Sequence, residues 1–168
     1  KLTHCEIKQE GKMLPYLINC EELEYLEIEG SEEKDLIVEN KKLRYLKMYG
    51  SPEGELNLTK CKKLTTLAIY KVKLKSIKLQ ANNSLTNLLI VNVEDMDFSF
   101  LAMCKSLKIL EISSRGSTFD LDILSGLNEL EILNLNHLEI SGNLNKMARL
   151  KKLTLKVSKL GSGAHSEL

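Results

Sequence analysis

The stretch LTTLAI at residues 64–69 returns as LTNLLI at residues 85–90 and as LKILEI at residues 107–112. Extended outward from these three copies, the apolar frame of the pattern Leu-x-x-Leu-x-Ile occurs eight times, with Cys5 once at position four and Met48, Leu135 and Leu155 at position six. Its first positions lie 20–23 residues apart, at Leu2, Leu23, Leu43, Leu64, Leu85, Leu107, Leu130 and Leu150. All 24 framework positions (three in each copy) are apolar although only 43% of the chain is, so the chance of accidental agreement is roughly 10⁻⁹. The chain is therefore built from a short internal repeat.

A repeat this short predicts a solenoid. One copy cannot bury its apolar side alone, so neighbouring copies stack and their strands form a parallel sheet. Side chains alternate along a strand, so positions four and six of each copy point inward and positions three, five and seven point outward. Eight strands spaced by about 4.8 Å would give an arc of about 38 Å.

These hexapeptides and their spacing resemble the leucine-rich repeat family. The resemblance covers residues 1–160, and residues 161–168 are predicted to be a flexible tail. It implies an α/β-type solenoid: a right-handed curved coil with a concave parallel β-sheet and mostly extended or short-turn segments on the convex side.

The connecting segments carry two further signals. Apolar pairs with a period of two predict extended return legs at Leu56/Leu58, Ile77/Leu79, Phe98/Phe100 and Leu121/Ile123, with room for a helical turn near residues 121–129 or 144–149. The family's common Asn, two residues after the strand, is absent, because that position holds Glu10, Ser31, Ser51, Val72, Val93, Arg115, Leu138 and Ser158. We therefore expect a divergent member whose turns are held differently.

Length and composition limit the possible classes of protein. The 168 residues suit a single domain, and the net charge of +1 argues against a surface built entirely for nucleic acid or for an anionic membrane. Apolar runs are too short to cross a bilayer, and no secretory leader pattern opens the chain. The first repeat begins at residue 2 without a polar cap, so we expect the chain to be part of a larger protein.

The four cysteines indicate a reducing, intracellular setting, cytoplasmic or nuclear. Cys20, Cys61 and Cys104 each lie three residues before the first leucine of alternate repeats. They would be about 10 Å apart, beyond the roughly 7 Å reach of a disulfide. No cysteine or histidine spacing suits zinc, and no nucleophile motif or phosphate-binding loop is present. We therefore predict no metal, no cofactor, no small-molecule substrate and no catalysis.

The outward strand positions are the predicted binding face. Four of the five tyrosines lie in this seventh of the sequence, and tyrosine is enriched at binding hot spots. An apolar strip continues the face, although strands also favour such residues without any partner. The candidate partner-binding residues are Tyr25, Tyr45, Lys47, Tyr49, Tyr70, Leu89, Val91, Ile109 and Ile132.

Three functions are compatible with these features. The favoured one is a non-catalytic module that binds a protein partner across the concave sheet. LAMCKSL at residues 101–107 resembles the cysteine-containing leucine-rich repeats of F-box ubiquitin ligases, so a substrate-recognition domain is an alternative. Residues 56–93 hold seven lysines and no acid. The stripe Lys60–Lys78 could track phosphates, but a solvated, aggregation-resisting edge is the favoured interpretation, because the lysines lack the interleaved aromatics of single-strand binders.

Overall fold

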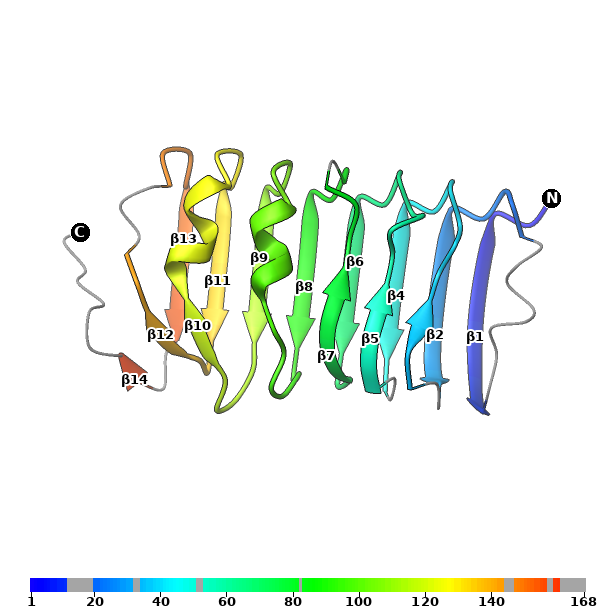
Figure 1. Ribbon diagram of the computed structural model, residues 1–168, viewed down its shortest axis with the longest axis horizontal. Coiled ribbons are helices and arrows are strands. Elements are labelled where there is room, and N and C mark those ends of the chain that lie inside the picture. Colours follow the sequence, from blue (N-terminus) through cyan, green and yellow to red (C-terminus); the bar gives the residue numbers. More distant parts are fainter. Residues whose placement is uncertain are drawn as a thin grey trace.

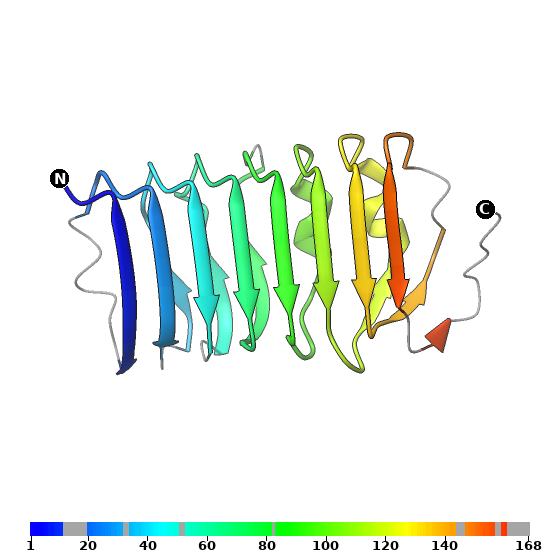
Figure 2. The ribbon, with the colours of Figure 1, turned by 180° about the vertical axis from the view of Figure 1, so that it is seen from behind.

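The protein is a solenoid of stacked coils (Figure 1). The computed structural model describes residues 1–11, 20–31, 34–50, 53–81, 83–143, 147–156 and 159–160. Figure 2 shows the long strands running down the near side and the return segments running up the far side while the chain advances from left to right. The coil is therefore right-handed, as the resemblance predicted.

An eight-stranded parallel sheet forms one side of the solenoid. Its register pairs His4, Tyr25, Tyr45, Thr66, Asn87, Ile109, Ile132 and Lys152 in one row, the same row that the repeat alignment gives for position three. In spatial order the strands are β1 His4–Gly11, β2 Tyr25–Ser31, β4 Tyr45–Tyr49, β6 Thr66–Tyr70, β8 Asn87–Val91, β9 Ile109–Ser113, β11 Ile132–Asn136 and β13 Lys152–Lys156.

Inward side chains of this sheet form the core. In β8, Leu88 and Ile90 are buried while Asn87, Leu89 and Val91 are half-buried, which is the alternation that a strand with one covered face requires. The first leucine of most coils is buried as well, so each coil contributes an apolar layer to one continuous core. The last described coil is more open, since Leu155 is 36% exposed.

The return side has two short parallel sheets rather than one. The first contains β3 Leu36–Ile37, β5 Glu53–Asn57 and β7 Lys73–Lys78, and the second contains β10 Thr118–Asp120, β12 Glu139–Ser141 and β14 Lys159–Leu160. The prediction of extended return legs is correct at Leu56 and Ile77, which lie in β5 and β7.

Two 3₁₀ helices replace the extended segments predicted at Phe98/Phe100 and Leu121/Ile123. They are η2 Ser99–Met103 and η3 Leu121–Gly126. An aspartate starts each one: Asp97 accepts a hydrogen bond from the Ser99 N–H at 2.8 Å, and Asp120 accepts one from the Asp122 N–H at 3.0 Å. One apolar pair with a period of two does not distinguish a strand from a single 3₁₀ turn. The hydrogen bonds that the aspartate side chains accept favour the turn. The helical turn suggested near residues 121–129 is therefore present, while 144–146 lie outside the described residues.

The turns that leave the main sheet are held by backbone hydrogen bonds instead of an asparagine ladder. The residue after position seven is often left-handed, with φ of 70° at Gly50, 52° at Lys71 and 61° at His137. Its N–H donates to the next coil, as from Lys71 to the Val91 carbonyl at 2.9 Å. The following residue is then free to be apolar, and Val72, Val93 and Leu138 are all buried there. This explains why the family's asparagine is missing.

The opposite turns are held by the column of cysteines and asparagines. Asn40 donates from Nδ2 to the Cys20 carbonyl at 2.6 Å, and the Cys61 thiol donates to the Val38 carbonyl at 3.2 Å. No disulfide joins any of the four cysteines, all of which lie in the described part of the chain, and Cys61 and Cys104 are buried. Burial, and after it the neighbouring Cys20, raises the pKa of the half-buried Cys5 thiol.

Candidate functional site

The outer face of the eight-stranded sheet carries every candidate residue from the sequence. We call this surface the strand face. Tyr49 is 37% exposed and the other eight are half-buried, because cross-strand neighbours cover part of each side chain. The apolar strip is therefore less open than the sequence suggested. In register order the rows hold Tyr25, Tyr45, Ile109 and Ile132; then Lys47 and Leu89; then Tyr49, Tyr70 and Val91.

Three rings stack at the N-terminal half of this face. The His4 and Tyr25 rings have centroids 4.0 Å apart and are parallel within 4°, and Tyr25 and Tyr45 follow at 4.7 Å and 6°. Parallel strands place the three residues side by side, so the sheet spacing sets the stacking distance. Both faces of the Tyr25 ring are therefore covered by neighbouring rings. His4 belongs to this array, although it was not among the candidate residues. Its position in the same row of the repeat alignment as Tyr25 could have predicted its place.

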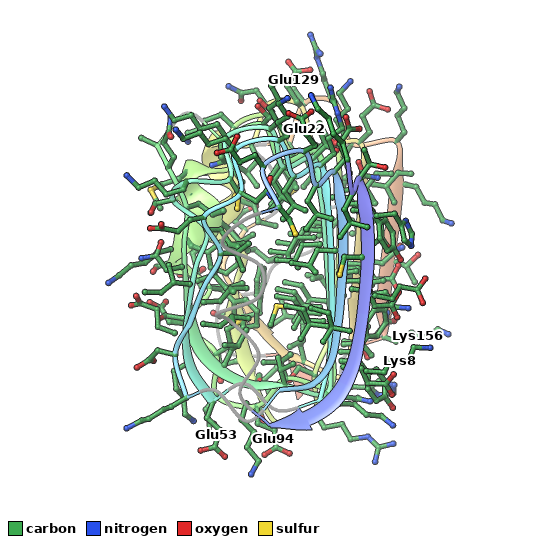
Figure 3. All side chains as sticks on the ribbon, turned by 90° about the vertical axis from the view of Figure 1, so that its right-hand side faces the viewer. Lys8, Glu22, Glu53, Glu94, Glu129 and Lys156 are labelled. Carbon is green, nitrogen blue, oxygen red and sulfur yellow. The ribbon has the colours of Figure 1, made fainter. Side chains whose placement is uncertain are left out.

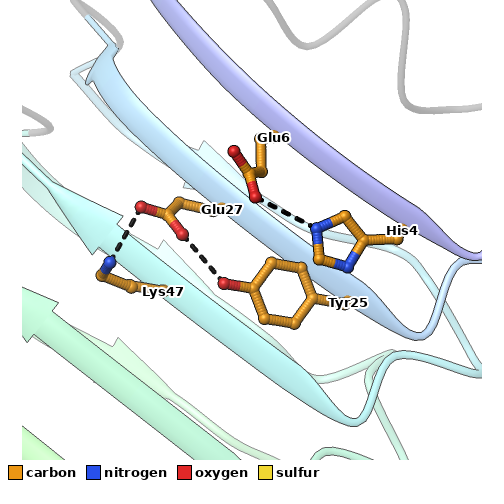
Figure 4. Close-up of polar contacts among 5 residues, drawn as sticks. All are labelled: His4, Glu6, Tyr25, Glu27 and Lys47. Carbon is orange, nitrogen blue, oxygen red and sulfur yellow. Dashed lines mark hydrogen bonds and ion pairs between the residues drawn. The ribbon is translucent and has the colours of Figure 1, made fainter.

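Charged groups fix two of these rings and belong to the site although they were not among the candidates. The Tyr25 hydroxyl donates to Glu27 Oε2 at 2.8 Å, and Lys47 Nζ donates to Glu27 Oε1 at 2.9 Å (Figure 4). His4 Nε2 lies 3.2 Å from Glu6 Oε1. The hydrogen bond from Lys47 is the largest cause that lowers the pKa of Glu27. The bond to Glu27 raises the pKa of Tyr25 to about 12, so the phenol stays neutral and keeps donating.

A second aromatic pair lies at the other end of the same strands. Tyr49 and Tyr70 have ring centroids 6.4 Å apart at an angle of 33°, and Lys71 Nζ lies 5.3 Å from the Tyr49 ring centroid. The left-handed turn at Lys71 directs its side chain back over the strand face. Ala68 lies between the two aromatic groups and is only 3% exposed, so the larger neighbours close over it.

The lysine stripe of residues 60–78 does not form a continuous anionic-ligand site. Lys73, Lys75 and Lys78 each pair with an acid of an adjacent coil, namely Glu53 at 3.3 Å, Asp95 at 3.6 Å and Glu55 at 2.8 Å. Lys71 contacts Tyr49 instead. The segment contains no acidic residue, and its lysines pair with acids of the coils on either side. These pairs could not be predicted from the local sequence.

Apart from a cavity of about 680 Å³ lined by residues that include Cys20, Leu26, Val38 and Asn40, the described part of the chain offers little for a site of another kind. No group of three or more metal-ligating side chains comes together within those residues. Among the helices that the structure describes, none is long and apolar enough to cross a membrane. The strand face is therefore the candidate functional site.

A solved structure with the same architecture is an internalin, InlF, from Listeria monocytogenes. The two superpose with a TM-score of 0.52 over 94% of this chain, at 20% sequence identity. The chain has the leucine-rich repeat fold. This leucine-rich repeat solenoid spans 58% of the internalin chain, and a similarity this distant concerns the fold alone. No protein-family model and no curated protein matches the chain.

Proposed function

We propose that this leucine-rich repeat solenoid is a non-catalytic protein-interaction module, part of a larger protein, that binds a protein partner through its strand face. The observation that supports the proposal is the ordered aromatic array of His4, Tyr25 and Tyr45, with Tyr49 and Tyr70 beside it. Rings that are already immobilised lose little side-chain entropy on binding, and tyrosine offers both apolar area and a hydroxyl.

The geometry of the rings favours a protein over a nucleic acid or a sugar. Bases stack on free ring faces, and in this array the inner faces are covered at 4.0 Å and 4.7 Å by neighbouring rings. Half-buried Leu89, Val91, Ile109 and Ile132 continue the surface and suit apolar side chains of a protein. These residues together make one extended patch across β2 to β11.

The experiment is affinity capture from a native lysate with three forms of the protein, read by mass spectrometry. The test variant combines Tyr45→Ala, Tyr49→Ala and Tyr70→Ala. The matched control combines Ile37→Ala and Met103→Ala, which removes exposed apolar side chains from the return side. A partner on the strand face is recovered by the wild type and the control and is lost from the test variant.

Circular dichroism and urea unfolding of all three forms show whether the tyrosine variant still folds. If it does not, Tyr45→Phe and Tyr70→Phe keep the rings and remove only the hydroxyls. Identical captures by the folded test variant and the control would contradict the assignment of this face.

The other two functions receive less support. Cys104, which suggested an F-box ligase, is buried, and its Sγ lies 3.6 Å from the Phe100 carbonyl, so it serves the packing of its coil. We keep the intracellular setting as part of the proposal, supported by Cys61 and Cys104, which are buried and not in a disulfide. Fractionation of cells that express the parent protein, followed by immunoblotting, tests it.

A further inference from the structure

Exposed lysines gather at the edge where the main-sheet strands begin. Lys41, Lys62 and Lys105 each lie two residues before the first leucine of a coil, and Lys63 follows Lys62; we call these four residues the lysine ridge. All four are exposed. The coils touch at this edge, since the Ser84 hydroxyl donates to the Lys62 carbonyl at 3.1 Å. Figure 3 shows this edge at Glu22 and Glu129, opposite the edge that carries Glu53 and Glu94.

The lysine ridge, like other exposed bases such as Lys60 and Lys108, forms no ion pair with an acid in the described part of the chain. On either side of it, acids pair with bases across coils: Lys42 with Glu22 at 2.6 Å, and Lys151 with Glu131 at 2.9 Å. Among the residues placed in the structure, no ion pair involves any of the four ridge lysines. Positive charge therefore remains at the middle of this edge on a protein whose net charge is only +1.

The ridge borders the strand face directly. Each strand of the main sheet begins two residues after the first leucine of its coil, so the row with Tyr45, Thr66 and Ile109 is the outward row nearest to the ridge. A segment that contacted this row would also lie within reach of the flexible lysine side chains. The two surfaces then form one binding site, with a floor of aromatic and aliphatic side chains that also carries Glu27 and Lys47, and with a cationic rim.

We propose that the partner presents an acidic segment, which lies across the strands with apolar side chains on the strand face and carboxylates against the lysine ridge. This inference rests on the proposed function and names the chemistry of its partner. Charge complementarity at a rim mainly speeds association and excludes unsuitable partners. Basic segments would meet like charge at Lys62, Lys63 and Lys105.

A protein segment fits this site better than a nucleic acid does. The row below the ridge continues with Ile109 and Ile132, which offer aliphatic contacts and no base-stacking plane. Both faces of the Tyr25 ring are already covered, by His4 and by Tyr45. Phosphate binding would use the ridge and leave the strand face unused.

The test selects a displayed library of random 16-residue peptides against the wild-type protein. Selected peptides are then synthesised with a fluorophore, and their affinities are measured by anisotropy at several salt concentrations. The ridge variant replaces Lys41, Lys62, Lys63 and Lys105 with Gln. The control removes the same charge from the opposite edge through Lys34→Gln, Lys73→Gln, Lys75→Gln and Lys78→Gln.

The expected result is enrichment of Asp, Glu and apolar residues in the selected peptides. Their affinity falls about tenfold in the ridge variant, because four rim charges are lost, and changes by less than about twofold in the control. Rising salt weakens binding to the wild type more than to the ridge variant.

Three outcomes would overturn the inference. Selection of neutral or basic peptides, or an equal loss of affinity in both lysine variants, would exclude an acidic partner. If the triple tyrosine variant still fails to bind the selected peptides, the strand face remains the proposed binding surface although its partner is not acidic. Ridge-dependent binding of (dT)20 that exceeds peptide binding would assign the edge to nucleic acid. A library that yields no peptide against the folded protein would count against both proposals.

Discussion

Buried thiols show how completely the coil interior is closed to water. Burial is the main cause that raises the pKa of Cys61 to about 11 and that of Cys104 to about 12. A thiol in the unfolded chain ionises near pH 8.5. The folded state therefore holds these two protons more tightly than the unfolded state does.

This difference makes stability depend on alkaline pH. Because the folded pKa values are raised, the contribution is fully present below about pH 8.5 and is lost as pH rises toward 11 and 12. Between pH 7.5 and 10 we expect the wild type to lose about 1–2 kcal/mol of unfolding free energy per thiol beyond the loss in a Cys61→Ala, Cys104→Ala variant. Urea unfolding across this pH range measures both slopes, and parallel curves would show that the thiols are not responsible.

The residue that follows position seven of the repeat varies in type although its backbone conformation is unusual. At the position after the seventh of the repeat the backbone is left-handed at Gly30, Gly50, Lys71, Asn92 and His137, although not at Ser114. The strain at the non-glycine positions is tolerated because the N–H there is bonded to the next coil, as in His137 to the Lys156 carbonyl at 2.6 Å. No residue type signals this position, so the alignment of residue types alone did not predict it.

At the scale of elements, the return sheet of β3, β5 and β7 depends on one close approach. Asp35, just before β3, accepts a hydrogen bond from the Glu55 N–H at 2.8 Å. A Cβ at Gly54, where φ is 88°, would lie 2.6 Å from the Lys34 carbonyl oxygen and would also meet the Asp35 carboxylate. Gly116 has a similar φ of 76°, but a Cβ added there would have no neighbouring atom within 4 Å.

These two glycines form a matched pair. Gly116→Ala should cost about 1 kcal/mol, because only the backbone conformation is unfavourable. Gly54→Ala should cost about 3 kcal/mol, because β5 must also move away from the preceding coil. Urea unfolding gives both values. Equal costs would mean that β3 and β5 adjust freely and that the approach at Gly54 is not important to this sheet.

The whole molecule has a nearly one-dimensional core. Each coil packs only on its neighbours, so stability is a sum of local terms rather than a single global one. Leu88 and Leu110 in the middle are 1% and 0% exposed, while Leu155 in β13 is 36% exposed. The coil of β13 therefore contributes less burial than the central coils.

Hydrogen exchange should reveal this gradient. We expect the amides of β8 and β9 to be the most protected and those of β13 to exchange at least about tenfold faster, because opening the last coil exposes less apolar surface. Mass spectrometry of exchanged peptides measures the rates strand by strand. Uniform protection from β8 to β13 would indicate that all the coils open as one unit.

The spacing of the leucines was enough to predict the repeat, the strand positions, the register and the outward rows, because alternation along a strand and stacking of copies follow from that spacing. All nine candidate residues lie on the strand face for that reason. Which charged side chains form ion pairs depends on the contacts between stacked coils, which only the three-dimensional structure shows. Glu53 and Lys73 are 20 residues apart and become an ion pair only when their coils stack. The stacked rings and the lysine ridge arise in the same way, since contacts between coils are set by three-dimensional proximity and not by the residues next to them in the chain.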